Sequence, residues 1–147
     1  MRRFQFRLDG VLGWRTVKLE LEEGRLEQLF TERRRCNEEA QALEARRLES
    51  AQLIAAKTLD GQQLAALSYH RHYLDRESAR MAAQRADCER LIAAQQQRVV
   101  EAERAVRLLE RLKERRLAEW TFDFNREMEA LASETFLSKW AREKKGL

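Results

Sequence analysis

The absence of proline from all 147 residues is the feature that most constrains the fold of this chain. Proline costs roughly 3 kcal/mol inside a helix and makes up about 5% of average usage, so its exclusion over this length indicates that nearly every position is helical. One helix-breaking segment stands out at residues 57–63, Lys-Thr-Leu-Asp-Gly-Gln-Gln. We therefore expect a single domain with helix one at about 3–57, a turn at about 58–63 and helix two at about 64–143.

The composition favours a narrow core over a globular one. Charged residues make up 37% of the chain and the mean hydropathy is -0.71, while aromatic residues and glycines are few. This balance is typical of long helices and coiled coils. Disorder is the alternative, but it is disfavoured because the apolar residues recur at helical spacing. The expected fold is all-α: a long antiparallel two-helix coiled-coil hairpin in which the second helix overhangs the first.

Seven-residue registers of mostly apolar residues predict the seam between the two helices. In helix one they pass through Leu12, Leu19, Leu26, Arg33, Ala40, Arg47 and Ile54, and through Leu8, Arg15, Glu22, Leu29, Cys36, Leu43 and Ser50. In helix two they pass through Leu67, Leu74, Met81, Cys88, Gln95, Ala102 and Leu109, and through Ile92, Val99, Val106, Lys113 and Trp120. Position i of helix one is expected to face roughly position 120 minus i of helix two.

The longer second helix is expected to lack a partner in this chain from about Leu117 onward. That part carries an apolar stripe: Leu117, Trp120, Phe124, Met128 and Leu131, continued by Phe136 and Trp140. Such a stripe favours another protein as partner, with dimerisation or a bend back on itself as the alternatives.

The same end of the hairpin is expected to be basic. The pairing brings Arg2, Arg3 and Arg7 beside Arg111, Lys113, Arg115 and Arg116. Alternatively, Glu110, Glu114 and Glu119 neutralise these cations.

Two tyrosines near the turn form a second candidate surface. Tyr69 and Tyr73 are four residues apart and share a helix face that points away from the seam. Tyrosines of this kind anchor protein interfaces, so we expect a docking patch with His70 as a polar neighbour, against the alternative of ordinary surface aromatics. His70 and His72 point to different faces, which argues against a metal site.

The sequence offers no catalytic machinery. It lacks a glycine-rich phosphate loop and a Ser or Cys nucleophile beside a histidine, so we expect no enzyme activity, no cofactor and no metal. The basic start is not followed by the apolar run of a signal peptide, and no run approaches the ~18 apolar residues of a membrane span. We therefore expect a cytoplasmic, soluble protein in which Cys36 and Cys88 are reduced seam residues, with a disulfide between them after a small register shift as the alternative.

The opening of the chain and its C-terminal part carry a family resemblance. The opening is Phe4-x-Phe6-x-Leu8-x-x-Val11-Leu12-x-x-Arg15, and the later block is Leu109-Glu110-Arg111-Leu112-Lys113-Glu114-Arg115-Arg116, with Trp120 and Glu127-Met128-Glu129 beyond. Over nearly its whole length the chain resembles the flagellar type III export protein FliJ family and its YscO-like virulence-secretion relatives, which are small cytoplasmic antiparallel coiled coils.

The resemblance implies a stalk-like adaptor that couples ATP hydrolysis to flagellar protein export and escorts chaperones. The implied partners are the export ATPase FliI, its regulator FliH, the export-gate protein FlhA and export chaperones. The implied location is the cytoplasm, peripherally at the inner membrane below the flagellar basal body, as a monomer or weak dimer.

Joined to the residue patterns above, the resemblance also assigns two sets of partner-binding residues. For the ATPase ring they are Arg3, Phe4, Phe6, Arg7, Arg111, Lys113, Arg115, Arg116, Trp120, Phe124, Met128 and Leu131. For the export gate they are Leu67, Tyr69, His70, Tyr73 and Leu74. The alternatives are a generic structural or dimerising coiled coil and a basic nucleic-acid-binding coiled coil. Nucleic-acid binding is disfavoured despite a pI of about 9.4, because acidic residues are interspersed throughout.

Overall fold

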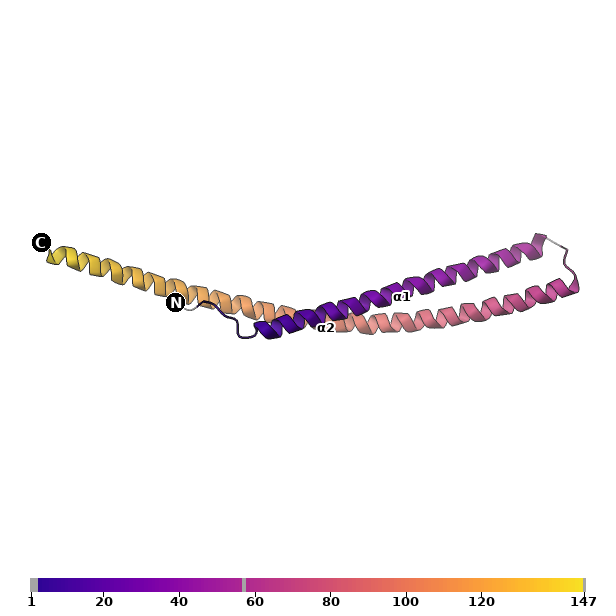
Figure 1. The fold of residues 1–147 in the computed structure, drawn as a ribbon, viewed down its shortest axis with the longest axis horizontal. Coiled ribbons are helices and arrows are strands. Elements are labelled where there is room, and N and C mark those ends of the chain that lie inside the picture. Colours follow the sequence, from indigo (N-terminus) through magenta and orange to yellow (C-terminus); the bar gives the residue numbers. More distant parts are fainter. Residues whose placement is uncertain (1–2, 57, 147) are drawn as a thin grey trace. The chain divides into compact units, whose positions relative to one another are not determined.

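Two long helices make up nearly all of the computed structural model, which describes residues 3–56 and 58–146. Helix α1 spans Asp9–Ala56 with 48 residues, and helix α2 spans Gly61–Lys145 with 85 residues. They pack against each other in a hairpin, as predicted, and Figure 1 shows the turn that joins them. No strand occurs among the described residues. Neither described helix contains a stretch apolar enough to cross a membrane.

The single domain expected from the sequence divides into two compact units. The central unit is Lys18–Glu101, and it contains the turn. The terminal unit combines Met1–Val17 with Ala102–Leu147. We describe each unit by itself.

In the central unit, the predicted seam positions of α2 form the core. They include Leu74, Met81, Cys88, Ile92, Gln95 and Val99, all at most 9% exposed. The facing seam positions of α1 from Leu19 to Leu43 are half-buried or buried. Since complete burial of a leucine or methionine contributes about 1.5 to 3 kcal/mol, this row is the main source of stability for the unit.

Polar contacts between the helices confirm the expected antiparallel register. Gln95 donates a hydrogen bond to the Glu22 carbonyl (3.0 Å), and Arg33 forms an ion pair with Glu89 (3.4 Å). The paired residue numbers add up to 117 and 122, close to the roughly 120 that the heptads predict. The helices are therefore aligned as the sequence pattern indicates.

A capping box at Asp60 begins α2. The Gln63 amide donates to Asp60 Oδ1 (2.8 Å), and the Asp60 amide donates to Gln63 Oε1 (3.3 Å). These reciprocal bonds satisfy amides that have no partner within the helix. The expected start of helix two at residue 64 is therefore too late, because residues 61–63 belong to the first helical turn. The expected end of helix one, Lys57, lies outside the described residues.

The expected start of helix one at residue 3 is wrong, because α1 begins only at Asp9. The Asp9 amide donates to the Phe6 carbonyl (3.2 Å) in a turn, and the Leu12 amide donates to the Leu8 carbonyl (2.8 Å) as the helix starts. Residues 3–8 are not helical, and in this conformation Phe6 is buried. Tertiary packing of the phenylalanines thus overrides local helix propensity, while Asp9 complements the positive end of the helix dipole.

Candidate functional site

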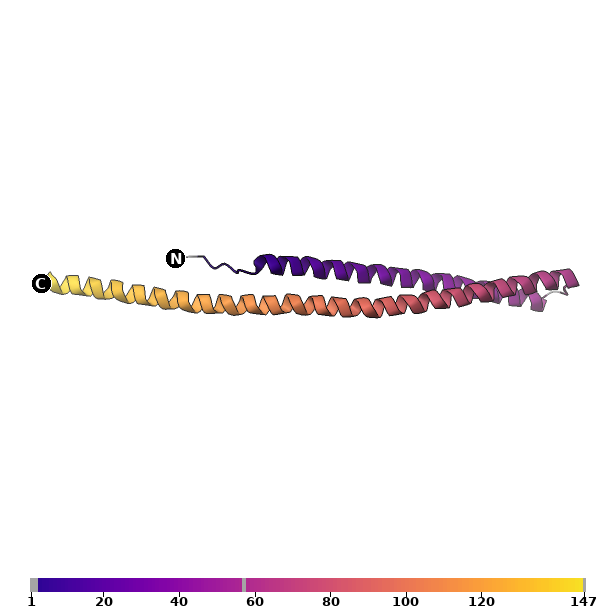
Figure 2. The ribbon, with the colours of Figure 1, turned by 90° about the horizontal axis from the view of Figure 1, so that it is seen from below.

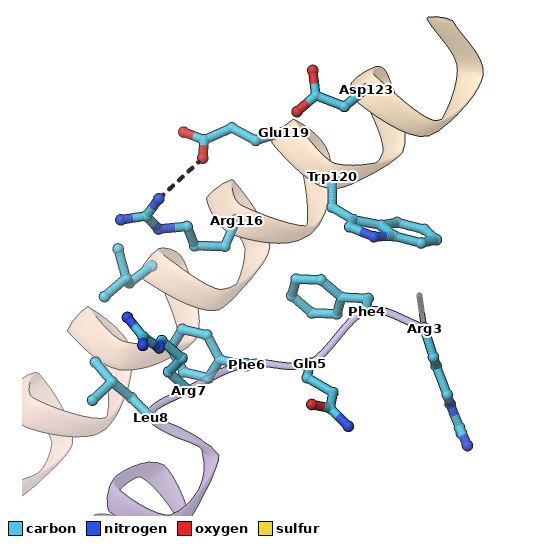
Figure 3. Close-up of a pocket in the computed structure, with 11 residues that line it drawn as sticks. Arg3, Phe4, Gln5, Phe6, Arg7, Leu8, Arg116, Glu119, Trp120 and Asp123 are labelled. Atoms are coloured by element: carbon cyan, nitrogen blue, oxygen red, sulfur yellow. Dashed lines mark hydrogen bonds and ion pairs between the residues drawn. The ribbon is translucent and has the colours of Figure 1, made fainter. Parts of the chain in front are cut away.

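Aromatic side chains from the N-terminal segment and from α2 meet in the terminal unit (Figure 3). The Phe4 and Trp120 ring centroids are 6.0 Å apart at an interplanar angle of 55°, and Trp120 stacks on Phe124 at 5.1 Å and 23°. Such pairs stabilise by about 0.5–1.5 kcal/mol beyond their buried area. We call Phe4, Phe6, Trp120 and Phe124 the aromatic cluster. All four were assigned to the ATPase ring: ring contacts join Phe4, Trp120 and Phe124, and Phe6 lines the same groove as Phe4 and Trp120.

The aromatic cluster borders an open groove of about 700 Å³. Its walls come from the N-terminal segment and from one face of α2. The lining residues are Arg3, Phe4, Gln5, Phe6, Arg7, Leu8, Leu112, Arg116, Glu119, Trp120 and Asp123. Apolar rings edged by charges of both signs suit a polypeptide ligand better than a small apolar one.

The cations of the terminal unit are only partly neutralised. Lys113 forms an ion pair with Asp9 (2.8 Å), and Arg116 forms one with Glu119 (3.5 Å). Four of the arginines expected to form the basic end make no ion pair within the described part of the chain: Arg3, Arg7, Arg111 and Arg115. Arg2 lies outside the described residues. Glu110 and Glu114 also form no ion pair among the described residues, so this end exposes charges of both signs, and of the cations expected to form it only Lys113 and Arg116 are paired directly.

The unpaired part of α2 begins later than expected. Trp120 and Phe124 are half-buried, Trp120 against Phe4, so the N-terminal segment covers this part of the stripe. Every described residue from Asn125 to Gly146 is exposed, and Figure 2 shows α2 continuing past the N-terminal segment. We call residues 125–146 the overhang. Its large apolar side chains are exposed by about half or more: Met128 47%, Leu131 55%, Phe136 69%, Leu137 58% and Trp140 49%.

The tyrosines near the turn are exposed, as expected, but one neighbour assigned with them is not. Tyr69 is 72% exposed, and Tyr73 is 45% exposed and stacks on His70 with ring centroids 6.5 Å apart. Leu67 is half-buried in the seam. Leu74 is fully buried, because a seam leucine packs against the opposite helix, so its side chain is not exposed beside the tyrosines.

A buried polar pair in the central unit was not singled out from the sequence. Glu22 is 8% exposed and Gln95 is 5% exposed. The Gln95 amide donates to both the carbonyl and the carboxylate of Glu22, and Arg25 reaches the other carboxylate oxygen (3.1 Å). A polar residue at one seam position is a known way to fix the register of a coiled coil. The signal was present in the sequence, because both residues occupy seam positions that face each other.

Both cysteines are free thiols, as expected for reduced seam residues. Burial raises the pKa of the Cys88 thiol, and the neighbouring Cys36, Glu32 and Glu89 add to this effect. A raised pKa keeps the thiol protonated and makes it a poor nucleophile. Among the described residues, no group of three or more His, Cys, Asp or Glu side chains is placed to hold a metal ion.

Comparison with protein-family models, curated proteins and solved structures finds no match to this chain. The site is therefore interpreted from its own geometry. Three separate regions are candidates for partner binding: the aromatic cluster with its groove and the overhang in the terminal unit, and the tyrosines near the turn in the central unit.

Proposed function

We propose that this protein is a non-enzymatic adaptor of the bacterial flagellar type III export apparatus. In this proposal it binds the export ATPase through its terminal unit and the export gate near its turn, and it couples ATP hydrolysis to the export of flagellar proteins. The proposal combines the sequence resemblance to the FliJ family with the surfaces that the helical hairpin presents. It places the protein in the cytoplasm, peripherally at the inner membrane.

The observation that carries the proposal is the exposed apolar overhang. The exposure of apolar side chains such as Leu131 and Phe136 to water is unfavourable. An unpaired apolar stripe on a helix is therefore typical of a protein-binding surface. The unpaired arginines of the same unit add a long-range attraction for an acidic partner surface, which would raise the association rate.

A deletion tests the assignment of the overhang. Removing residues 126–147 leaves the aromatic cluster intact, including the Phe4–Trp120 contact. We expect the shortened chain to keep its hairpin but to bind the purified export ATPase more weakly and to stimulate its ATP hydrolysis less. If the shortened chain binds the ATPase and stimulates it as the full chain does, the overhang is not the ATPase site.

A pair of substitutions narrows the test to the apolar stripe. Met128→Gln with Leu131→Gln removes two exposed apolar residues without shortening α2, and we expect at least about a tenfold loss of affinity for the ATPase, as for interface anchors. The matched control is Phe122→Gln. Phe122 is 68% exposed but lies about 120° around the helix from Met128. An equal loss in the control would mean that the stripe has no specific role.

The gate contact is tested separately by Tyr69→Ala with Tyr73→Ala. We expect weaker binding to the export-gate protein with unchanged helicity, because both rings are on the surface. Leu91→Ala is the control, since Leu91 is also exposed on α2 in the central unit. Unchanged gate affinity of the tyrosine variant would remove the tyrosines from the proposal.

A dimerising coiled coil is the second candidate function, and the same overhang favours it. Two copies that pair through Met128, Leu131, Phe136 and Trp140 would cover the exposed stripe. Sedimentation at several concentrations separates the two functions: a monomer at micromolar concentration supports the adaptor, and a tight dimer lost on deletion of residues 126–147 supports the dimer.

A further inference from the structure

A second groove lies in the central unit, between α1 and α2 close to the turn. It has a volume of about 320 Å³. Its lining residues are Glu44, Arg47, Leu48, Ser50, Ala51 and Ile54 from α1, and Leu67, Arg71 and Leu74 from α2. None of the exposed tyrosines lines it, but Leu67 and Leu74 do, so this groove adjoins the surface assigned to the export gate.

The groove exists because polar residues occupy seam positions at this end of the unit. Arg47 and Ser50 are seam residues of α1, and Arg71 lies three heptads before Ile92 on α2. Burial of a guanidinium in a two-helix core without a partner is strongly unfavourable, so these positions remain hydrated and the adjoining apolar residues are exposed to solvent. Ile54 is 42% exposed at a seam position, and its neighbour Leu48 is 57% exposed.

The shape of the groove favours a helical occupant. The lining residues of α1 recur every three to four positions from Glu44 to Ile54, so they follow one face of the helix for about 15 Å. A groove between two helices, lined along one helix face by apolar and charged residues, is the geometry in which an amphipathic helix docks as a third helix.

The charges that line the groove indicate that the docked helix carries a carboxylate. Asp75 is one turn from Arg71, but its carboxylate pairs with Arg47 (3.2 Å), which also approaches Glu44 at 4.0 Å. Within residues 3–56 and 58–146, Arg71 has no ion-pair partner. An apolar helix laid over the groove would strip water from this guanidinium, so it must supply a carboxylate in return.

We propose that this groove binds an amphipathic helix of another protein that carries a glutamate or aspartate within its apolar face, paired with Arg71. Leu48, Ala51, Ile54 and Leu67 provide the apolar floor. The inference does not rest on the function proposed above, because it uses only the groove and its charges.

A pair of synthetic helical peptides tests the proposal with the full chain. Each is about 18 residues long, with leucines at helical spacing; one carries a glutamate among the leucines and the other a lysine at that position. Fluorescence anisotropy of the labelled peptides measures the binding. We expect the glutamate peptide to bind about tenfold or more tightly than the lysine peptide, and Arg71→Glu to reverse that order. Arg71→Gln should abolish the preference for the glutamate peptide, and Ile54→Asp should weaken the binding of both peptides.

The matched control is Arg76→Glu, which makes the same charge change at an exposed α2 position that does not line the groove. It should keep the preference for the glutamate peptide. Circular dichroism checks that each variant keeps its helicity. The proposal is overturned if neither peptide binds, if Arg71→Glu leaves the order unchanged, or if Arg76→Glu reverses it equally. It is also overturned if sedimentation shows self-association that Arg71→Glu abolishes, because the occupant is then a second copy of this chain.

Discussion

Substitution of Gln95 by leucine should destabilise the central unit even though it places an apolar residue in a coiled-coil seam. Gln95 is 5% exposed, and its amide is the donor to both the carbonyl and the carboxylate of Glu22. Without it, the Glu22 carboxylate keeps only Arg25 as a partner. An unsatisfied buried polar group costs about 1–3 kcal/mol, and more when it is charged. The extra apolar burial of leucine offsets part of this, so we expect a loss of about 1–3 kcal/mol.

The reciprocal substitution should cost less. In Glu22→Leu, the Gln95 amide loses one of its two acceptors but still donates to the carbonyl of residue 22 at 3.0 Å, and no charge is left buried without its partner. We expect a loss of about 1 kcal/mol or less. The double variant, Glu22→Leu with Gln95→Leu, should be more stable than Gln95→Leu alone, because replacing both members of a buried polar pair by apolar residues removes the stranded charge.

Urea unfolding followed by far-UV circular dichroism measures these free energies of unfolding. Gln97→Leu is the matched control: Gln97 is exposed on the same helix, so its free energy of unfolding should stay within about 0.5 kcal/mol of the parent. A Gln95→Leu variant as stable as the parent would refute the reasoning, and so would a double variant less stable than both single variants.

Two further predictions concern the turn and the buried thiol. Asp60→Ala removes the acceptor for the Gln63 amide and should lower the free energy of unfolding by about 1 kcal/mol, whereas Asp60→Asn keeps an acceptor and should lose less; equal losses would argue against the cap. Because burial raises the pKa of Cys88, the folded state holds the thiol proton to higher pH than the unfolded state does. The free energy of unfolding should therefore fall as pH rises above about 8.5, and that of Cys88→Ala should fall less steeply over the same range. Denaturant titrations at several pH values measure this, and the same pH dependence in both proteins would contradict the burial effect.

The repeating part of the fold is where sequence analysis succeeded. Seam residues such as Leu74, Met81 and Ile92 are buried where the heptads predict, because the 3.6-residue period of a helix fixes which positions share a face. The ends were less predictable. Residues 3–8 were expected to be helical, but the contact of Phe4 with Trp120 on the other helix and the burial of Phe6 accompany a non-helical segment.

The candidate sites likewise include features that the sequence predicts and features that depend on the other helix. Exposure of Tyr69 and Tyr73 follows from their register, which is a local property. The groove at Arg71 does not follow from register alone, because whether a seam arginine finds a carboxylate depends on which residues the other helix places opposite it. In this chain Asp75 pairs with Arg47, and that choice leaves Arg71 without a partner among the described residues.

The sequence by itself determined that this chain forms two helices, where they turn and which faces meet, since proline exclusion, heptad spacing and the helix-breaking segment at residues 57–63 all act within a few residues. Only the tertiary structure decided which polar seam residues are satisfied and which apolar residues are covered. The pairing of Glu22 with Gln95 joins residues that are far apart in the sequence, and the same holds for Phe4 and Trp120. The heptads place Glu22 opposite Gln95, but whether two such side chains bond, and which residue Phe4 meets, depends on the alignment of the two helices and on what each side chain finds opposite it.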